Sequence, residues 1–550
     1  MQLPHLAPAS GARTKLPLLH DSADALALAT LWRNARPLLV LTETAQDAER
    51  LRTELAFFAP ELRIFLLPDW ETLPYDSFSP HQDLISERLA TLYQITHEAF
   101  DVAVVPVTTA LYRLPPASFI AGHTFFLTQG AKLPAQILRK QLMLAGYTHV
   151  TQVVSPGEFC FRGGVIDLFP MGSALPYRID LFDDEVDTIR TFDVDTQRSI
   201  YKVNDVRLLP AREFPSDDAA RTAFRVRFRE KFEGDPSRSR LYKDVSQGFL
   251  PAGIEYYLPL FFDETATLFD YLPPGTHVCL HHAVAEAVRQ FWTDTQSRYN
   301  LLRGDADRPL LPPADLFLRE DEFFGGLKPF SRIELSTPGT TIDPGVPAST
   351  NALPPVAVDR RANNPLALLT SFCENFEGRV LLIAESLGRR ETMLGLLHEY
   401  QLRPAVCESW SAFEQSTQPL MLTVGPLHAG FVDPGNRIAI VTENELYPSQ
   451  VRTRTTRERR VSAEGMLRDL SEVKVGDPVV HSQHGIGRYL GLATMDLGEG
   501  ETEFLTLEYA AGDKLYVPVS QLAMISRYSG ASEEAAPLHK LGSGQWEKAR

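Results

Sequence analysis

The stretch "GEFCFRGGVIDLFP" (157–170) holds the residues whose types most clearly suggest a binding chemistry. Arg162 stands beside two glycines in a run that otherwise reads as a β-strand. Adjacent glycines weaken a strand because they add backbone entropy and contribute no side chain to pack. They are expected where the chain bends or where a partner comes close. The run therefore predicts either a β-bulge with a solvated arginine or an arginine placed for a binding partner.

Phosphate chemistry can be tested directly on the sequence. A phosphate-binding loop of the form G-x4-G-K-[ST] needs glycine amides around the phosphates and a lysine to neutralise them, and the chain contains no Gly-Lys dipeptide. The acidic runs "DDEVD" (183–187) and "DETA" (263–266) resemble a magnesium-binding box. Without that loop they are expected to be solvated surface acids. "GIGRYLG" (485–491) has dinucleotide-like glycines, but no helix follows it. We expect no nucleotide cofactor and no ATPase activity in this chain.

Metal and nucleophile sites find little support. The pairs His281–His282 and His481/His484 lack the further ligands that a zinc site needs. The four cysteines are far apart and form no CxxC pair, which excludes zinc-ribbon spacing and is typical of free thiols in a reducing compartment. No serine has a detectable triad context. The sequence therefore predicts no catalytic residue and no metal ligand.

Composition sets the broad limits. A chain of 550 residues is too long for one core, and about three to five domains are expected. The net charge is -16 at pH 7, so any contact with nucleic acid must be local. No uninterrupted apolar run reaches the length of a membrane span, and the N-terminus lacks a signal-peptide core. We expect a cytoplasmic protein without a membrane partner.

The first 125 residues alternate predicted helices and strands. Residues 22–35 and 45–59 have the spacing of helices, while "PLLVLTET" (37–44) and "DVAVVPV" (101–107) read as buried strands. Strands separated by helix-length segments predict βαβ units and a parallel sheet, as in nucleotide-binding and helicase-like folds.

Further along the chain the pattern changes three times. A helix followed by strands at 158–170, 176–182 and 186–193, with no helices between them, predicts a small α+β insert. A smaller α/β pattern follows a linker rich in Pro, Thr and Gly. Short β runs with glycine turns over 473–527 then predict a small barrel. Five arginines within 451–460 are most simply solvated, with a weak DNA or interdomain contact as the alternative.

Three stretches resemble known proteins. "PDWETLPYDSFSPHQDLISERLATLYQI" (68–95) is similar to the first domain of the excision-repair protein UvrB, and 157–193 is similar to the UvrB insert that docks onto UvrA. "VGDPVVHSQHGIGRYLG" (475–491) and the strands after it resemble the RNA-polymerase-interaction module shared with CarD-type regulators. In this order, and over essentially the whole chain, they resemble the bacterial transcription-repair-coupling factor family (Mfd).

The resemblance implies a domain plan. In the family a two-lobed DNA translocase that uses ATP and Mg²⁺, and a C-terminal regulatory domain, follow the polymerase module. Both are expected beyond Arg550, so the chain is expected to be the N-terminal half. The first domain lacks the ATP loop that UvrB carries, and the stretch between Tyr75 and Ser86 is too short for UvrB's DNA-gripping hairpin. The predicted parts are a degenerate UvrB-like, helicase-like α/β domain (1–124 and 209–335), its UvrA-docking α+β insert (125–208), a linker (336–358), a small α/β domain (359–448), an arginine-rich linker (449–472), a Tudor/CarD-like β-barrel (473–530) and the start of a helical connection (531–550).

The resemblance also implies the UvrA-binding residues. In the family this surface includes the arginine of the RG pair, a second arginine one strand later and a nearby phenylalanine. Here these match Arg162, Arg178 and Phe182. Alternation supports the grouping, because Arg178, Asp180 and Phe182 share one face of a strand while the residues between them face the core. An exposed aromatic side chain beside two arginines is the composition of an interface hot spot.

The predicted polymerase module is acidic rather than basic. Residues 473–527 hold seven acidic and four basic side chains, which favours a protein partner over DNA. The run "YLGLATMD" (489–496) reads as an exposed strand that can extend a partner's sheet. The predicted contacts with the β subunit of RNA polymerase are Leu492, Thr494 and Met495; the alternative for Met495 is a core or turn residue.

Taken together, these features predict a monomeric adaptor without catalysis of its own. It would bind stalled RNA polymerase and recruit UvrA, while DNA would be bound weakly or through the motor domains. Two other functions fit the sequence less well. An intact ATPase or helicase conflicts with the missing Gly-Lys dipeptide, and a CarD-like regulator acting through RNA polymerase alone would leave the first 450 residues unexplained.

Overall fold

The computed structural model gives the fold of most of the chain. For 494–496, 501–503, 511, 518, 526 and 527 it describes the backbone only. The described residues are 11–16, 18–33, 35–335, 349–359, 361–447, 475–481, 485–496, 501–518, 525–527 and 538. The predicted arginine-rich linker and nearly all of the predicted helical connection lie outside them.

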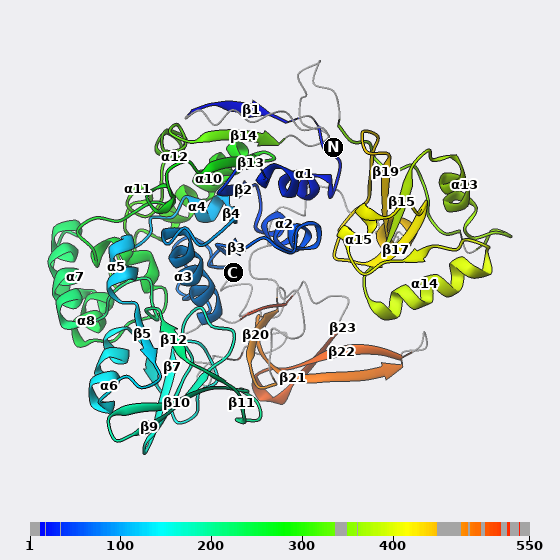
Figure 1. Cartoon of the computed structure of the whole chain (residues 1–550). Helices are drawn as coiled ribbons and strands as arrows, with labels where there is room; N and C mark the ends of the chain where they lie inside the picture. Colours follow the sequence, from blue (N-terminus) through cyan, green and yellow to red (C-terminus); the bar gives the residue numbers. More distant parts are fainter. Residues whose placement is uncertain are drawn as a thin grey trace.

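A six-stranded parallel sheet forms the centre of the first domain (Figure 1). Its strands, in spatial order, are β1 (Arg13–Lys15), β14 (Ser331–Leu335), β13 (His277–His281), β2 (Leu38–Thr42), β4 (Val102–Pro106) and β3 (Ile64–Leu66). The predicted strands at 37–44 and 101–107 and the predicted parallel pairing are confirmed. Strands β13 and β14 come from residues beyond the insert, so the chain leaves this sheet and returns to it.

Both faces of this sheet are buried, which explains its continuous apolar strands. Alternate residues of β2 pack into different clusters: Val40 packs toward helices α1 (Ala23–Trp32) and α2 (Ala45–Phe58), and Leu39 packs into the opposite cluster. Helix α2 begins where the side chain of Thr44 accepts a hydrogen bond from the backbone N–H of Asp47, which satisfies an otherwise unpaired N-terminal donor.

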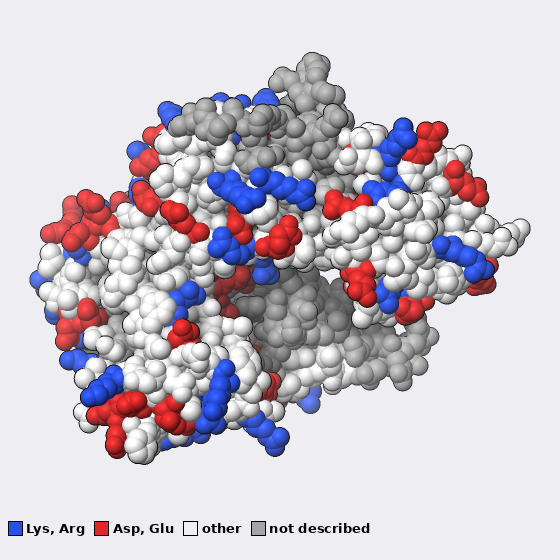
Figure 2. Space-filling model, viewed as in Figure 1, with Lys and Arg blue, Asp and Glu red and all other residues white. Residues whose placement is uncertain are grey.

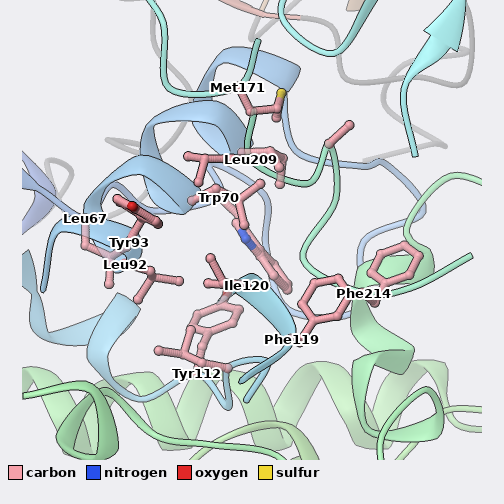
Figure 3. Close-up of a cluster of buried hydrophobic side chains, with 14 of the residues drawn as sticks. Leu67, Trp70, Leu92, Tyr93, Tyr112, Phe119, Ile120, Met171, Leu209 and Phe214 are labelled. Atoms are coloured by element: carbon pink, nitrogen blue, oxygen red, sulfur yellow. The ribbon is translucent and has the colours of Figure 1, made fainter. Parts of the chain in front are cut away.

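The remaining helices of the first domain surround the opposite cluster. They are α3 (Gln82–Thr96), α4 (Val107–Ala110), α5 (Ala117–Gly122), α7 (Asp218–Lys231), η1 (Pro236–Arg238), α8 (Arg240–Gln247), η2 (Ile254–Leu260), α9 (Leu268–Tyr271), α10 (Val284–Leu302), α11 (Pro313–Leu316) and α12 (Glu320–Gly326). Figure 3 shows Trp70 at the centre of this cluster with Tyr112, Phe119 and, from the insert, Met171. The insert and the first domain therefore share one hydrophobic core. No helix in the described ranges is long and apolar enough to cross a membrane.

The insert is built on strands that pair antiparallel, except for the parallel pair β6–β7. Its ends form a pair, β5 (Phe125–Thr128) with β12 (Asp205–Leu208), and α6 (Ala135–Leu144) follows β5. The six-stranded sheet, in spatial order, is β11 (Ser199–Val203), β10 (Glu185–Phe192), β9 (Tyr177–Phe182), β8 (Val165–Leu168), β7 (Glu158–Arg162) and β6 (Thr148–His149). The strand predicted over 158–170 is therefore two strands joined by a turn.

The small α/β domain packs against α1 and α2 of the first domain (Figure 1). Residues 349–359 also pack against this domain, where Asn351 bridges to Val432 and Val356 is buried in its core. Its five-stranded sheet has the order β16-β17-β15-β19-β18, and all neighbours except β18 and β19 are parallel. The elements are α13 (Ala367–Asn375), β15 (Arg379–Ala384), α14 (Leu387–Glu399), β16 (Ala405–Val406), α15 (Trp410–Gln415), β17 (Leu420–Val424), β18 (Phe431–Asp433), β19 (Ile438–Thr442) and α16 (Glu443–Leu446).

The C-terminal module is a five-stranded antiparallel sheet with the order β23-β22-β21-β20-β24. Its strands are β20 (Pro478–His481), β21 (Gly485–Asp496), β22 (Glu501–Glu508), β23 (Lys514–Pro518) and β24 (Ile525–Arg527), with η4 (Ala510–Gly512) before β23. The short β runs predicted over 473–527 are confirmed, and the strand predicted at 489–496 is the second part of β21. Within the described residues β23 and β24 are the two edges of the sheet, and no pair of residues closes it into a barrel.

Candidate docking sites

Gly163 and Gly164 form the two-residue turn of a β-hairpin. Arg162 on β7 pairs with Val165 on β8, so the predicted bulge within one strand is wrong. Gly163 has φ +62°, a value at which glycine has no steric cost. A Cβ added to Gly164 would lie 3.1 Å from the carbonyl oxygen of Leu181, whose N–H donates to the Gly164 oxygen at 2.7 Å. The second glycine is therefore explained by close packing of the hairpin on β9.

The carboxylate of Asp167 holds both predicted arginines. Asp167 is fully buried on β8, and Arg178 donates to its two oxygens at 2.7 and 3.0 Å through Nε and Nη2. Arg162 donates to the same carboxylate from the hairpin. The guanidinium of Arg178 also lies 4.8 Å from the centre of the Phe192 ring, and its hydrogen bonds to Asp167 raise the pKa of Arg178. This buried carboxylate fixes the two cations beside each other.

Phe182 is an exposed aromatic residue on the strand of Arg178. Its exposed fraction is 75%, which is unusual for a large apolar side chain. Ile179 is fully buried and Leu181 packs partly against the core, so the predicted alternation along β9 is confirmed. The structure thus places Arg162, Arg178 and Phe182 on the outer face of one sheet, which we call the docking face.

Sequence reasoning missed the acids that organise this face. Asp167 follows the Arg162 turn within the quoted stretch, but its partners depend on which strands pair, and spacing alone does not reveal this. Asp180, which had been grouped with Arg178, accepts hydrogen bonds from Arg190 at 2.7 Å and from Thr188 at 2.6 Å. Strand alternation offers one signal. Asp167 lies two residues after Val165, the partner of Arg162, and therefore on the same face of the sheet as the arginines.

The carboxyl edge of the first sheet is the place where related α/β folds bind nucleotides. A cavity of about 610 Å³ lies there, lined by Glu43, Asp69 and Thr295 among others. The protein's own carboxylates occupy nearby donors: Glu43 accepts from the N–H of Ala283 at 3.2 Å, and Asp69 accepts from the hydroxyl of Thr108 at 3.1 Å. Such carboxylates repel a phosphate rather than cradle it.

A buried polar cluster lies beside this edge. The Asp24 Oδ2 atom is 2.8 Å from His281 Nε2 and 3.8 Å from His282 Nε2, so the prediction that the histidine pair has no further potential ligand is wrong. Arg50, however, donates to both Asp24 oxygens at 2.6 and 3.0 Å. Burial alone would raise the pKa of Asp24, but the hydrogen bonds from His281 and Arg50, with His282 close by, hold it well below its ordinary value. The cluster is a buried ion pair rather than an open metal site.

In the C-terminal module, β21 projects beyond its neighbour β20. Its residues up to Arg488 pair with β20, whereas Gly491–Asp496 pair with β22 alone among the described strands. Leu492 is directly opposite Leu505 and is 45% exposed. The side chains of Thr494 and Met495 lie outside the described residues, so the structure places only their backbone, opposite Glu503 and Thr502.

Comparison with known proteins gives the relatives of these domains. Family models match the UvrB interaction domain at 125–214, the MFD D3 domain at 372–446 and the CarD-like/TRCF RID domain at 473–529. The chain is 44% identical over 524 residues to the transcription-repair-coupling factor of Escherichia coli, a match that covers 94% of this chain and 45% of that protein. The chain belongs to the transcription-repair-coupling factor family. It spans about half the length of the curated relatives that it matches.

Other members of the family match the same extent of chain. The Haemophilus influenzae factor is 41% identical over 96% of this chain and 46% of its own length, and the Bacillus subtilis factor is 26% identical over 94% and 45%. The UvrB-interaction match contains Arg162, Arg178 and Phe182. Because the matches extend over all three domains, a CarD-like regulator acting through its last module alone does not account for this chain.

Proposed function

We propose that this chain is a two-sided adaptor of transcription-coupled DNA repair. The docking face of the insert binds UvrA through Arg162, Arg178 and Phe182, and the C-terminal module binds the β subunit of RNA polymerase through Leu492, Thr494 and Met495. The chain itself acts as a monomer in the cytoplasm, has no catalytic residue, and needs neither ATP nor a metal. In the whole family member, DNA translocation would belong to motor domains.

The observation that carries the UvrA assignment is the buried carboxylate of Asp167. It holds Arg178 through two hydrogen bonds and pairs with Arg162, while Phe182 remains exposed beside them. Because the arginines are held in place before binding, a partner orders fewer side chains and more of the interaction energy appears as affinity. Arginine and aromatic residues are the usual anchors of protein interfaces.

The RNA polymerase assignment is supported by the free edge of β21. Backbone groups of Gly491–Asp496 face no strand on the side away from β22 in the described part of the chain. An extended segment of a partner can add there as a further strand. In this proposal the sheet of the C-terminal module closes as a small CarD-type barrel. The first domain is a degenerate helicase-like scaffold, in which the protein's own carboxylates take the place of a nucleotide's phosphates.

The experiment is a binding assay with each partner separately. Purified UvrA should bind the chain, and the Arg162→Glu, Arg178→Glu double variant should lose at least about 30-fold in affinity, since buried hot-spot residues are worth about 2 kcal/mol or more. Arg240→Glu is the matched control, because its side chain is 83% exposed on α8. Binding of RNA polymerase should be unchanged in both variants. Full UvrA affinity in the double variant would refute the docking assignment.

A further inference from the structure

The strand register aligns a row of charged residues across the docking face. Asp167 on β8 is directly opposite Arg178 on β9, Arg178 is opposite Arg190 on β10, and Arg190 is opposite Lys202 on β11. Directly paired residues share one face of a sheet. Three successive cations, Arg178, Arg190 and Lys202, therefore extend from the buried aspartate to the edge strand. Arg190 and Lys202 have no role in the function proposed above.

Arg190 is held in place much as Arg178 is. Its Nη2 atom donates to Asp180 at 2.7 Å and to the hydroxyl of Thr188 at 3.2 Å. Its side chain is 38% exposed, and in the described part of the chain its Nε atom is buried without a hydrogen-bond partner. The guanidinium is therefore held in place by Asp180 and Thr188 while part of it stays accessible to a carboxylate of a partner.

The row ends at the open edge of the sheet. Strand β11 is the last strand in the spatial order, and four of its five residues are exposed. Ile200, two residues before Lys202 on the same strand, is 54% exposed. Exposed apolar side chains of this size are typical of protein interfaces. The row therefore combines positive charge with apolar contact area.

We propose that Arg190 and Lys202 extend the docking face, so that this face binds several carboxylates of an acidic protein segment lying across β9, β10 and β11. The proposal rests on the proposed function and takes UvrA as the source of that segment. Exposed Ile200 on the edge strand favours a protein over a phosphate backbone, because it offers apolar area that DNA backbone contacts do not use.

The test is to measure UvrA affinity and its salt dependence for Arg190→Gln and Lys202→Glu. Arg190→Gln should weaken binding about tenfold, because the variant removes a pre-organised charge. Lys202→Glu should weaken it several-fold, mainly through a slower association rate, and both variants should flatten the loss of affinity with added salt. Lys140→Glu on α6 is the matched control, because Lys140 is exposed and lies outside the row.

The outcomes separate this inference from the function on which it rests. If the Arg162→Glu, Arg178→Glu variant lost UvrA binding while Arg190→Gln and Lys202→Glu bound normally, the proposed function would stand and the extension of the docking face would be overturned. Normal binding in the Arg162, Arg178 variant would overturn both. Weaker binding of a 30-base-pair duplex, with unchanged UvrA affinity, would show that the row reads phosphates and would also overturn it. Circular dichroism and melting confirm folding, and Arg190→Lys, which keeps the charge, should retain most of the affinity.

Discussion

The side chain of Glu54 on α2 accepts a hydrogen bond at 2.8 Å from the backbone N–H of His428, 374 residues later in the chain. Glu54 also accepts from the hydroxyl of Ser22 at 2.9 Å, and Ser22 accepts from the N–H of Ala429 at 3.2 Å. Beside these bonds Phe58 meets Trp410 edge to face, with ring centres 5.0 Å apart. The first domain and the small α/β domain therefore share buried polar and apolar contacts.

Truncation of Trp410 should uncouple the two domains. The side chain is 4% exposed within the cluster that joins them, and removing a buried aromatic residue costs about 3–5 kcal/mol. Trp410→Ala should release the small domain as a separate fragment in limited proteolysis. Leu369→Ala is the control, because Leu369 lies in the small domain's own core and its loss should destabilise that domain without exposing the joint. Resistance to proteolysis in Trp410→Ala equal to that of the parent would contradict a coupling role.

Asp167→Asn should weaken UvrA binding although Asp167 is buried and cannot touch a partner. The change removes the charge that fixes Arg162 and Arg178. Breaking a buried ion pair at one end lowers the free energy of unfolding by about 3–5 kcal/mol, and we expect about 2 kcal/mol here because Arg162 is half exposed. Urea unfolding measures the stability loss, and titration calorimetry measures affinity. The exposed Asp195→Asn variant should match the parent in both; a normal UvrA affinity for Asp167→Asn would show that the arginines need no positioning.

The Asp24–Arg50 pair should give the fold an acid-sensitive component. The pKa of Asp24 is well below its ordinary value of 3.8 in the folded chain. Its stabilisation is therefore fully present above about pH 4 and is lost as the pH falls from there through the folded pKa. Asp24→Asn should be less stable than the parent at pH 7, and the difference should shrink below pH 4. Urea unfolding of both proteins at pH 7, 5, 4 and 3 measures the difference in their free energies of unfolding. A difference that stayed constant with pH would contradict an acid-sensitive role for the Asp24–Arg50 pair.

Adding ATP and Mg²⁺ should leave the melting temperature unchanged. Glu43 and Asp69 already accept hydrogen bonds at the carboxyl edge of the first sheet, and no Gly-Lys dipeptide is present to bind phosphates. A nucleotide at 100 times its dissociation constant would add about 2.7 kcal/mol of stability. Differential scanning fluorimetry with millimolar ATP measures this directly, and a clear upward shift would reveal a nucleotide site.

Met495→Arg should leave the C-terminal module folded and weaken its binding to RNA polymerase. The backbone of Met495 lies on the part of β21 that, among the described strands, pairs only with β22, and a partner strand would bring its own side chains against it there. Leu505→Arg is the contrasting variant, because Leu505 is 1% exposed and should unfold the module. Unfolding of Met495→Arg would assign the residue to the core, and normal polymerase binding would place the contact elsewhere.

Local patterns were enough to predict much of the fold. Helix α2 and strand β2 follow from periodicity, because neighbouring residues decide them. One of the two alternatives for Gly163 and Gly164, a bulge within a single strand, is wrong, because strand length alone does not separate a bulge from a hairpin turn. The contacts of Asp167 with Arg178, and of Glu54 with His428, were beyond reach because they depend on tertiary pairing. The resemblance supplied the candidate residues, and the fold supplied the acids that hold them.

The two ends of the insert lie side by side, because Phe125 on β5 pairs with Leu208 on β12. A segment with adjacent ends can enter or leave a host gene without opening the host fold. Met171 of the insert, however, is buried in the same core as Trp70 (Figure 3). Connectivity makes the insert portable between proteins, while the shared core determines its orientation. Any host that acquires such a segment would have to acquire matching core residues with it.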